Sequence, residues 1–185
     1  MTIHIDTPRF YMREFLPTDV ADIFMLDTDP EVHRYLGKNP ITRYAQAEEI
    51  VEDVMAQYER NGIGRWAVIE KTNGEFVGWS GLKLEDMIRD EPYYDIGYRL
   101  KRKFWRQGFG YDSAQVSLDH GFEKLGYEDI YGGADVENIG SNKILKKIGL
   151  HWKEVFPYKG CPINWYGLSR DEWLSRKGDL SLIHI

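Results

Sequence analysis

The chain has 185 residues, of which 42% are hydrophobic and 14% aromatic, and it carries 30 acidic against 24 basic side chains. This composition predicts a packed globule, and the length suits one domain over residues 1–185, with a loosely ordered tail at 177–185. The net charge of −6 disfavours a general nucleic-acid binder. A lone cysteine excludes an internal disulfide, and no apolar run suits a signal peptide or membrane span, so we expect a cytoplasmic protein.

The first half of the chain predicts a strand, two helices and a hairpin. Apolar and polar residues alternate in the expected strands, whereas the apolar residues of the expected helices recur every three to four positions. Asn73-Gly74, a strong signal for a two-residue hairpin turn, separates the last two strands. The expected elements are a strand at residues 7–15, helices beginning near Val20 and Ala45, and strands at 65–71 and 76–84.

The next strand leads into a turn that contains two glycines. Residues 94–100 alternate, which places Asp95 and Arg99 on one face, and Gly108-Phe109-Gly110 then opens a segment with helical periodicity. A glycine turn at a helix N-terminus presents unpaired backbone N–H groups beside the positive end of the helix dipole, so it can hold a phosphate. The alternative is that the glycines only allow a tight turn.

Two familiar phosphate-binding motifs do not fit this turn. A P-loop requires Gly-Lys-Ser/Thr, but Gly110 is followed by Tyr111-Asp112. A dinucleotide fingerprint requires a third glycine where Ser113 stands, within an early βαβ unit. Residues 94–114 instead resemble the signature of the GNAT superfamily of acyl-CoA N-acyltransferases, in its RimJ/RimL-like branch. The shared features are a strand ending in Ile-Gly-Tyr-x-Leu, a Trp, Gly-x-Gly and a helix.

A second motif, Asn138-x-x-Ser141-x-Lys143, resembles the Asn-x-x-Ser-x-Arg/Lys segment of the same branch. On the residues alone, Asn138 or Ser141 would simply cap a helix. The resemblance implies an α/β (α+β) GNAT fold, with a mixed, mostly antiparallel sheet of about six or seven strands flanked by helices. It also implies a V-shaped splay between the fourth and fifth strands. The remaining expected elements are strands at 129–136, 150–158 and 163–168 and helices at 138–148 and 170–176.

The resemblance implies that acetyl-CoA is the co-substrate and that no metal is needed. The pyrophosphate of CoA would lie on backbone amides of residues 106–111, the pantetheine beside residues 98–100, and the sulfur near the second motif. The five histidines show no metal-ligand spacing. The implied CoA-binding residues are Tyr98, Arg99, Leu100, Arg106, Gln107, Gly108, Phe109, Gly110, Tyr111, Asn138, Ser141 and Lys143.

Asp95 and Ser141 are the implied catalytic residues. Transfer to an amine requires a base and a group that assists the departing thiolate. Asp95 lies where the branch often has Glu, so we expect it to act as the base through a water, although it could equally be a solvated or ion-paired strand residue. Ser141 would assist the thiolate or only hydrogen-bond the sulfur, and Tyr98, Tyr158 and Tyr166 are alternative acids.

The acceptor is expected to be a primary amine, either a protein N-terminus or a small molecule, with no direct contact to nucleic acid or membrane. Trp79 and Tyr166 are the expected substrate-binding residues, with Trp66 and Trp165 as further candidates, and for each the alternative is an ordinary core position. The rival to an enzyme is a non-catalytic acyl-CoA-binding or sensing module of the same fold. A homodimer would agree with the branch.

Overall fold

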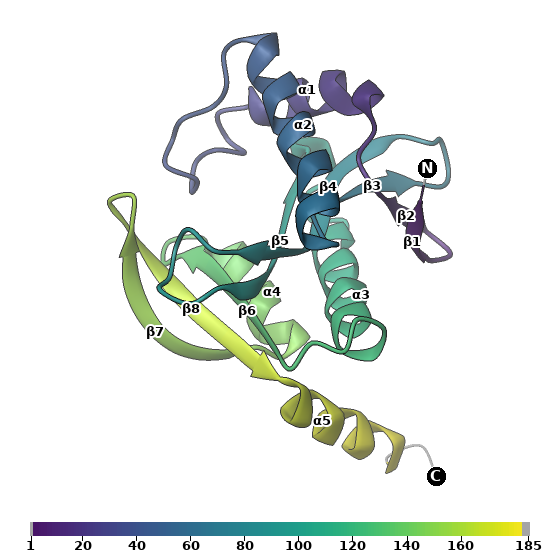
Figure 1. Ribbon diagram of the computed structural model, residues 1–185, viewed down its shortest axis with the longest axis vertical. Coiled ribbons are helices and arrows are strands. Elements are labelled where there is room, and N and C mark those ends of the chain that lie inside the picture. Colours follow the sequence, from purple (N-terminus) through teal and green to yellow (C-terminus); the bar gives the residue numbers. More distant parts are fainter. Residues whose placement is uncertain (1, 183–185) are drawn as a thin grey trace.

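The computed structural model describes residues 2–182, and the side chains as far as residue 178. One eight-stranded sheet has the order β1-β2-β3-β4-β5-β6-β8-β7 (Figure 1). The strands are β1 (Ile3–Asp6), β2 (Phe10–Arg13), β3 (Trp66–Glu70), β4 (Phe76–Glu85), β5 (Tyr93–Leu100), β6 (Asp129–Asp135), β7 (His151–Tyr158) and β8 (Cys161–Ser169). The helices are α1 (Val20–Asp27), α2 (Tyr44–Asn61), α3 (Phe109–Glu123), α4 (Ile139–Ile148) and α5 (Arg170–Leu182), with short 3₁₀ turns η1 (Pro17–Asp19) and η2 (Arg102–Phe104).

The sheet is mixed and mostly antiparallel, which confirms the predicted fold class. Only β5 and β6 pair in parallel. The sheet gains a strand over the expected number because residues 3–6 pair with β2. The first strand expected at residues 7–15 begins late, because Thr7 folds back and donates both its amide and its hydroxyl to the carbonyl of Phe10, at 2.9 Å and 2.6 Å.

Two local predictions differ from the structure. The hairpin between β3 and β4 closes through five residues, 71–75, instead of two. Within it, Asn73 Oδ1 accepts from the amide of Glu75 at 2.9 Å, and Gly74 takes the left-handed conformation with a φ of 72°. At the C-terminal end, α5 continues past residue 176 to Leu182, so it includes most of the segment expected as a loose tail. Residues 183–185 lie outside the described part.

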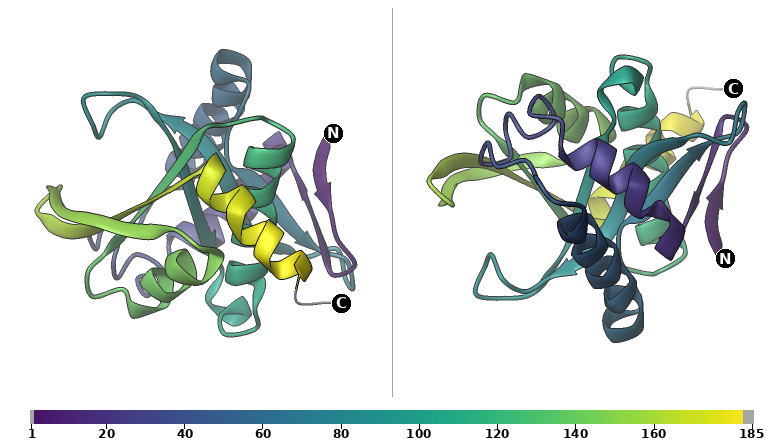
Figure 2. Two further views of the ribbon diagram at one scale, coloured as in Figure 1. Left: turned by 90° about the horizontal axis from the view of Figure 1, so that it is seen from below. Right: turned by 90° about the horizontal axis from the view of Figure 1, so that it is seen from above.

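Helices cover both faces of the sheet, and each face has its own core. Views from opposite sides show α1 and α2 in front of the sheet from above, and α3, α4 and α5 from below (Figure 2). Leu118 and Phe122 of α3 are fully buried against one face, whereas Ile23 of α1 and Val51 of α2 pack on the other. Burial of each such side chain stabilises the fold by roughly 1.5–3 kcal/mol.

The sheet splits where β5 meets β6. Only Tyr94 with Ile130 and Asp95 with Tyr131 are paired between these strands, although β5 continues to Leu100. On its other side β5 pairs with β4 along its whole length. The backbone of residues 96–100 therefore has a free edge toward β6. This confirms the V-shaped splay expected between the fourth and fifth predicted strands, which are β5 and β6. Within residues 2–182, no helix has the length and hydropathy needed to cross a membrane.

Candidate active site

The glycine turn begins α3, and its two glycines have different roles. Gly108 is the N-cap and has a φ of 89°, which a residue with a side chain rarely adopts. No side chain caps this helix, so its first amides are available to an anion. Gly110 instead allows close packing, because a Cβ there would lie 3.1 Å from the ring of Tyr98 and 3.3 Å from Ile144.

Two further side chains lie at this turn: Arg9, which the sequence did not single out, and Trp105, the Trp of the first motif. The guanidinium of Arg9, from the hairpin between β1 and β2, stacks 3.8 Å from the Phe109 ring centroid. Its Nη1 also lies 3.3 Å from Asp112 Oδ2 in the first turn of α3. The indole of Trp105 donates to the carbonyl of Leu100 at 2.9 Å, which ties the turn to the end of β5. The expected CoA ligands at 106–108 are exposed.

The second motif lies across the split from β5. Asn138 Oδ1 accepts from the amide of Ser141 at 3.1 Å, so Asn138 is the N-cap of α4. The hydroxyl oxygens of Ser141 and Tyr98 lie 3.1 Å apart. Burial raises the pKa of Tyr98, although the hydrogen bond with Ser141 opposes this, so the phenol is neutral at ordinary pH and able to donate. Lys143 is exposed on α4.

Asn142, which the sequence motifs did not indicate, is the centre of a hydrogen-bond network. Its Oδ1 accepts from the Tyr166 hydroxyl at 2.7 Å and from Asn164 Nδ2 at 2.9 Å. Its Nδ2 donates to the carbonyls of Asp135 and Asn138, both at 2.8 Å. Tyr166 is 1% exposed and belongs to the core, where it joins α4 to β8. The structure thus places this predicted substrate-binding residue away from any described cavity.

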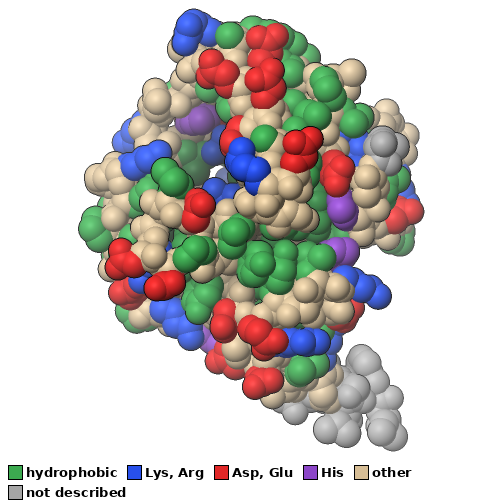
Figure 3. Space-filling view, viewed as in Figure 1, with side chains coloured by type: hydrophobic (Ala, Val, Ile, Leu, Met, Phe, Trp, Pro, Cys, Tyr) green, Lys and Arg blue, Asp and Glu red, His purple; other side chains and the backbone are tan. Residues whose placement is uncertain are grey.

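A cavity of about 440 Å³ lies on the opposite face of β5, between the sheet and α2. The space-filling view shows Lys and Arg side chains around a hollow beside α2 (Figure 3). Trp79, a predicted substrate-binding residue, lines the cavity, whereas Trp66 is in the core and Trp165 packs against Tyr131. The lining residues are Phe15, Asp27, Ile50, Asp53, Val54, Gln57, Arg65, Trp79, Lys83, Glu85, Ile88, Asp95, Arg99 and Tyr158.

Asp95 is the last residue of β5 that pairs with β6, so it lies where the two strands diverge. Its side chain lines this cavity. Its Oδ2 accepts from Arg65, which also donates to the carbonyls of Gly81 and, at 2.5 Å, of Asp95 itself. The guanidinium lies over Gly97, where a Cβ would be 2.9 Å from Nη2. The Asp95 side chain is 17% exposed, and its Oδ1 has no hydrogen-bond partner among the described residues. Burial raises the pKa of Asp95, against the opposing charges of Arg65 and Lys83.

Three other carboxylates line the cavity, but they are engaged or buried. Glu85 accepts from Lys83 Nζ at 2.5 Å and from the amide of Met87 at 3.0 Å. Burial alone would raise the pKa of Glu85, but these hydrogen bonds hold it below its ordinary value. Asp53 accepts hydrogen bonds at both of its oxygens. Asp27 has no exposed surface. Asp95 is therefore the carboxylate of this cavity that combines a partly exposed side chain with an oxygen free of hydrogen bonds among the described residues.

Arg99, expected among the CoA ligands, directs its side chain into the cavity and away from the split. Its Nη1 donates to Asp27 Oδ1 at 2.6 Å, and its guanidinium lies 5.1 Å from the centroid of the Trp79 ring. His33 Nε2 lies 3.3 Å from the same Asp27 oxygen. Only the backbone of Arg99 is left to contribute to the free edge of β5.

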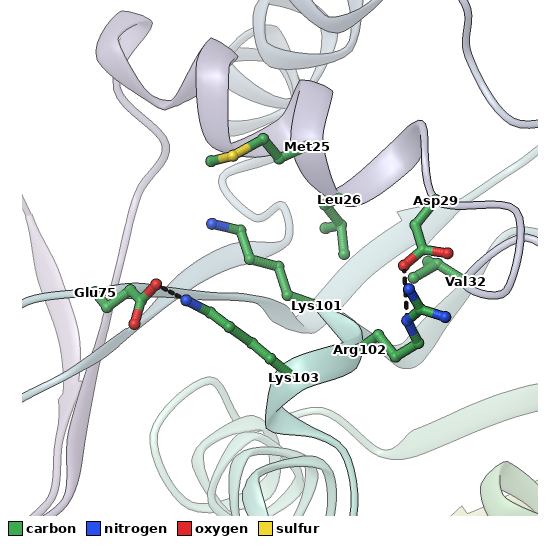
Figure 4. Close-up of a pocket in the computed structure, with 8 residues that line it drawn as sticks. All are labelled: Met25, Leu26, Asp29, Val32, Glu75, Lys101, Arg102 and Lys103. Atoms are coloured by element: carbon green, nitrogen blue, oxygen red, sulfur yellow. Dashed lines mark hydrogen bonds and ion pairs between the residues drawn. The ribbon is translucent and has the colours of Figure 1, made fainter.

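The basic run at residues 101–103 does not form a free anion site. Each of its cations is paired with an acidic side chain from α1, the segment after it or the β3–β4 hairpin. Figure 4 shows the pairs of Arg102 and Lys103. A second cavity, of about 350 Å³, lies among these pairs. The pairs are Lys101 with Asp22 at 2.6 Å, Arg102 with Asp29 at 3.2 Å, and Lys103 with Glu75.

The structure therefore groups the predicted residues around the split sheet. On one side, the free edge of β5, the turn at Gly108 and the Tyr98–Ser141 pair lie near α3 and α4. On the other side, Asp95, Trp79 and Tyr158 line the cavity near α2. The described residues contain no cluster of three or more His, Cys, Asp or Glu side chains that could hold a metal ion.

Sequence comparison identifies relatives of known class. The model of the family described as "Acetyltransferase (GNAT) domain" matches residues 9–151. The N-acetyltransferase p20 of Bacillus licheniformis is 28% identical over 142 residues, which cover 77% of this chain and 79% of p20.

Two solved structures with bound CoA share the fold. The RimL ribosomal L7/L12 α-N-protein acetyltransferase in complex with CoA has a TM-score of 0.76 at 18% identity, with coverage of 92% of this chain and 99% of that one. The spermidine N-acetyltransferase from Vibrio cholerae, in complex with CoA and spermine, has a TM-score of 0.74 at 16% identity, with coverage of 91% and 99%.

Proposed function

Because the chain belongs to the GNAT family of acetyl-CoA-dependent N-acetyltransferases, we propose that it transfers an acetyl group directly to a primary amine within a ternary complex. One observation carries this proposal. The pairing of β5 with β6 ends at Asp95, so the free strand edge and the cavity approach each other at a carboxylate. The acetyl donor and the amine can therefore approach from opposite faces of the split sheet.

The residues on the α3 side fit CoA. Uncapped amides at Gly108–Tyr111 and the positive end of the α3 dipole suit a pyrophosphate. The unpaired backbone of residues 98–100 suits the amides of a pantetheine, which would add to β5 in the manner of a strand. Acetyl-CoA, when bound, supplies the acetyl thioester. Asn138 acts here as a helix cap that positions Ser141.

We assign the base to Asp95. A protonated amine has no lone pair, so the nitrogen must lose a proton before or as its bond to the acetyl carbon forms and the carbon–sulfur bond breaks. The free Oδ1 of Asp95 can take this proton through a water. Burial raises the pKa of Asp95, which makes the carboxylate a stronger base than an exposed aspartate.

The Tyr98–Ser141 pair is the group we assign to the leaving sulfur. A neutral phenol and a hydroxyl 3.1 Å apart can share one hydrogen bond and still direct a second O–H toward the split. Such a donor would stabilise the thiolate as it departs, and the phenol is the better proton source because a serine hydroxyl is far less acidic.

The amine class is supported by the family and by the two structural neighbours, an α-N-protein acetyltransferase and a spermidine N-acetyltransferase. The cavity offers Trp79 and Tyr158 beside Asp95 for such an acceptor. The proposal needs neither nucleic acid nor a membrane, and a homodimer stays a prediction.

Free-thiol release from acetyl-CoA tests the proposal, with a panel of N-terminal peptides, amino acids, polyamines and aminoglycosides. Amine-dependent release is the expected result. If acetyl-CoA raised the melting temperature but no amine gave release, the protein would be a non-catalytic acyl-CoA-binding module. If acetyl-CoA gave neither effect, the placement of CoA at Gly108 would be wrong as well.

A further inference from the structure

The cavity on the α2 side contains three cationic side chains, and they differ in how many donors remain free. Arg65 directs its donors to Asp95 and to the carbonyl of Gly81 and is buried. Lys83 lies 2.5 Å from Glu85. Arg99 has five N–H groups, and only Nη1 has a hydrogen-bond partner among the described side chains. Lys83 also keeps N–H donors beyond its contact with Glu85, but Arg99 has the most unused donors of the three and lies on the same face of β5 as Asp95.

Asp27 positions Arg99 but accepts a hydrogen bond from only one of its nitrogens, Nη1. The carboxylate has no exposed surface, and one oxygen, Oδ1, receives both Arg99 Nη1 at 2.6 Å and His33 Nε2 at 3.3 Å. The other oxygen and Arg99 Nε are buried without a hydrogen-bond partner. A buried polar atom without a hydrogen bond is destabilising, so a further polar partner at this cluster would be favourable.

The aromatic wall beside Arg99 is unsuited to an alkylammonium group. The guanidinium groups of Arg99 and Arg65 lie 5.1 Å and 5.5 Å from the Trp79 ring centroid, within the range of a cation–π contact. Trp79 is thus already in cation–π range of two guanidinium groups. A second ammonium of a polyamine would meet two like charges at this wall, whereas an oxygen acceptor would meet N–H donors.

We infer that Arg99, positioned by Asp27, recognises a carbonyl or carboxylate oxygen next to the reacting amine, so that the acceptor is an α-amino compound and not a simple polyamine. This inference rests on the proposed function, because it takes the cavity at Asp95 as the acceptor site. Asp95 and Arg99 lie on the same face of β5 with Gly97 between them, so one small molecule can meet the base with its nitrogen and Arg99 with its oxygen. A free amino acid, an amino-acid amide and a peptide N-terminus all present this chemistry.

Matched amines test whether the acceptor needs a carbonyl or carboxylate oxygen next to its amine. Alaninamide and isopropylamine differ by replacement of the amide with a methyl group, and alanine, an alanyl peptide and spermidine complete the set. We expect kcat/KM, corrected for the fraction of free amine, to be roughly 10- to 100-fold higher for alaninamide than for isopropylamine, the effect of one hydrogen bond to a charged group. The comparison of alanine, alaninamide and peptide identifies which α-amino source is preferred.

Two variants assign the preference to Arg99. Arg99→Met should raise KM for alaninamide by about tenfold or more and leave the values for isopropylamine nearly unchanged. Lys83→Met, which removes a cation of the same cavity, is the matched control and should keep the preference. Asp27→Asn should weaken the preference with little change in kcat, as expected of a positioning residue.

Equal or higher kcat/KM for isopropylamine or spermidine would overturn the inference, as would a uniform loss for all amines in Arg99→Met. Binding of the product N-acetylalaninamide, measured by calorimetry against N-isopropylacetamide, gives an answer that does not need turnover. Product binding that requires Arg99, without thiol release from any amine, would support the inference while the proposed reaction fails. Equal binding of the two amides by wild type and Arg99→Met would overturn it.

Discussion

The hydroxyl groups of Tyr98 and Ser141 lie 3.1 Å apart and join β5 to the start of α4 across the split in the sheet. The two residues come from separate motifs, 43 positions apart. Asn138 fixes the position of Ser141, and Gly110 allows α3 to approach the Tyr98 ring. The two motifs of the chain therefore meet at one hydrogen bond, close to where the strand edge is free.

Removing either hydroxyl should slow turnover more than it weakens substrate binding. For Tyr98→Phe and for Ser141→Ala we expect kcat to fall by about tenfold each, the value of one hydrogen bond, with KM for acetyl-CoA within about twofold of wild type. Because the two groups act on one site, the double variant should lose less than the product of the single losses. Steady-state kinetics on all three variants checks this, and full additivity would show that the hydroxyls act separately.

Gly108→Asp should weaken CoA binding sharply. A carboxylate at the α3 N-cap would lie beside the pyrophosphate, and we expect Kd to rise by about tenfold or more, as measured by calorimetry. Gly126→Asp is a matched control, since Gly126 also has a positive φ, of 71°, with nothing within 4 Å of an added Cβ. An unchanged Kd in Gly108→Asp would mean that the phosphates bind elsewhere.

Gly97→Ala should disturb the Arg65–Asp95 pair. The new methyl group would lie 2.9 Å from Arg65 Nη2, and the buried guanidinium would have to move. Overpacking of this kind costs about 1–3 kcal/mol, so the free energy of unfolding should fall by that amount and kcat should fall with it. Gly140→Ala serves as the control, because its Cβ would only reach an ordinary contact at 3.7 Å. Urea unfolding of both variants measures the difference.

Stability should fall on acidification through the ordinary range of histidine. Burial, followed by the charge of Arg99, lowers the pKa of His33 below its usual value, against the attraction of Asp27. The unfolded chain then binds a proton near pH 6.5 that the folded chain does not yet accept, so stability is lost as pH falls from about 6.5 to the folded-state pKa. His33→Gln should reduce the slope, and replacement of the exposed His151 should not. Urea titrations at pH 7.5 and 5.5 test this.

The site residues that we predict from the sequence are those with local signatures. Asp95, Gly108 and Ser141 each lie in a strand, turn or cap that a short window reveals. Arg65 was missed because its partner Asp95 is 30 residues away and is reached only through the register of β3, β4 and β5. No local pattern encodes such a pairing.

Burial on both faces explains why Tyr166 was assigned to the acceptor pocket. The segment from Trp165 to Leu168 in β8 is buried throughout, so alternation did not show which side chains face a cavity and which face the core. Asp27 was missed for a related reason. At the C-terminal end of α1 it resembles an ordinary charged helix residue in the sequence, and only the fold brings it to Arg99, 72 positions later.

The most direct test of the proposed mechanism is the kcat of Asp95→Asn for acetyl transfer, measured beside the Kd for CoA. We expect kcat to fall by roughly 100-fold or more, the usual contribution of a positioned base, with CoA binding unchanged. Asp129→Asn, an exposed aspartate on β6, should retain full activity. If Asp95→Asn kept the wild-type kcat, the amine would lose its proton to another group and Asp95 would serve only to hold Arg65.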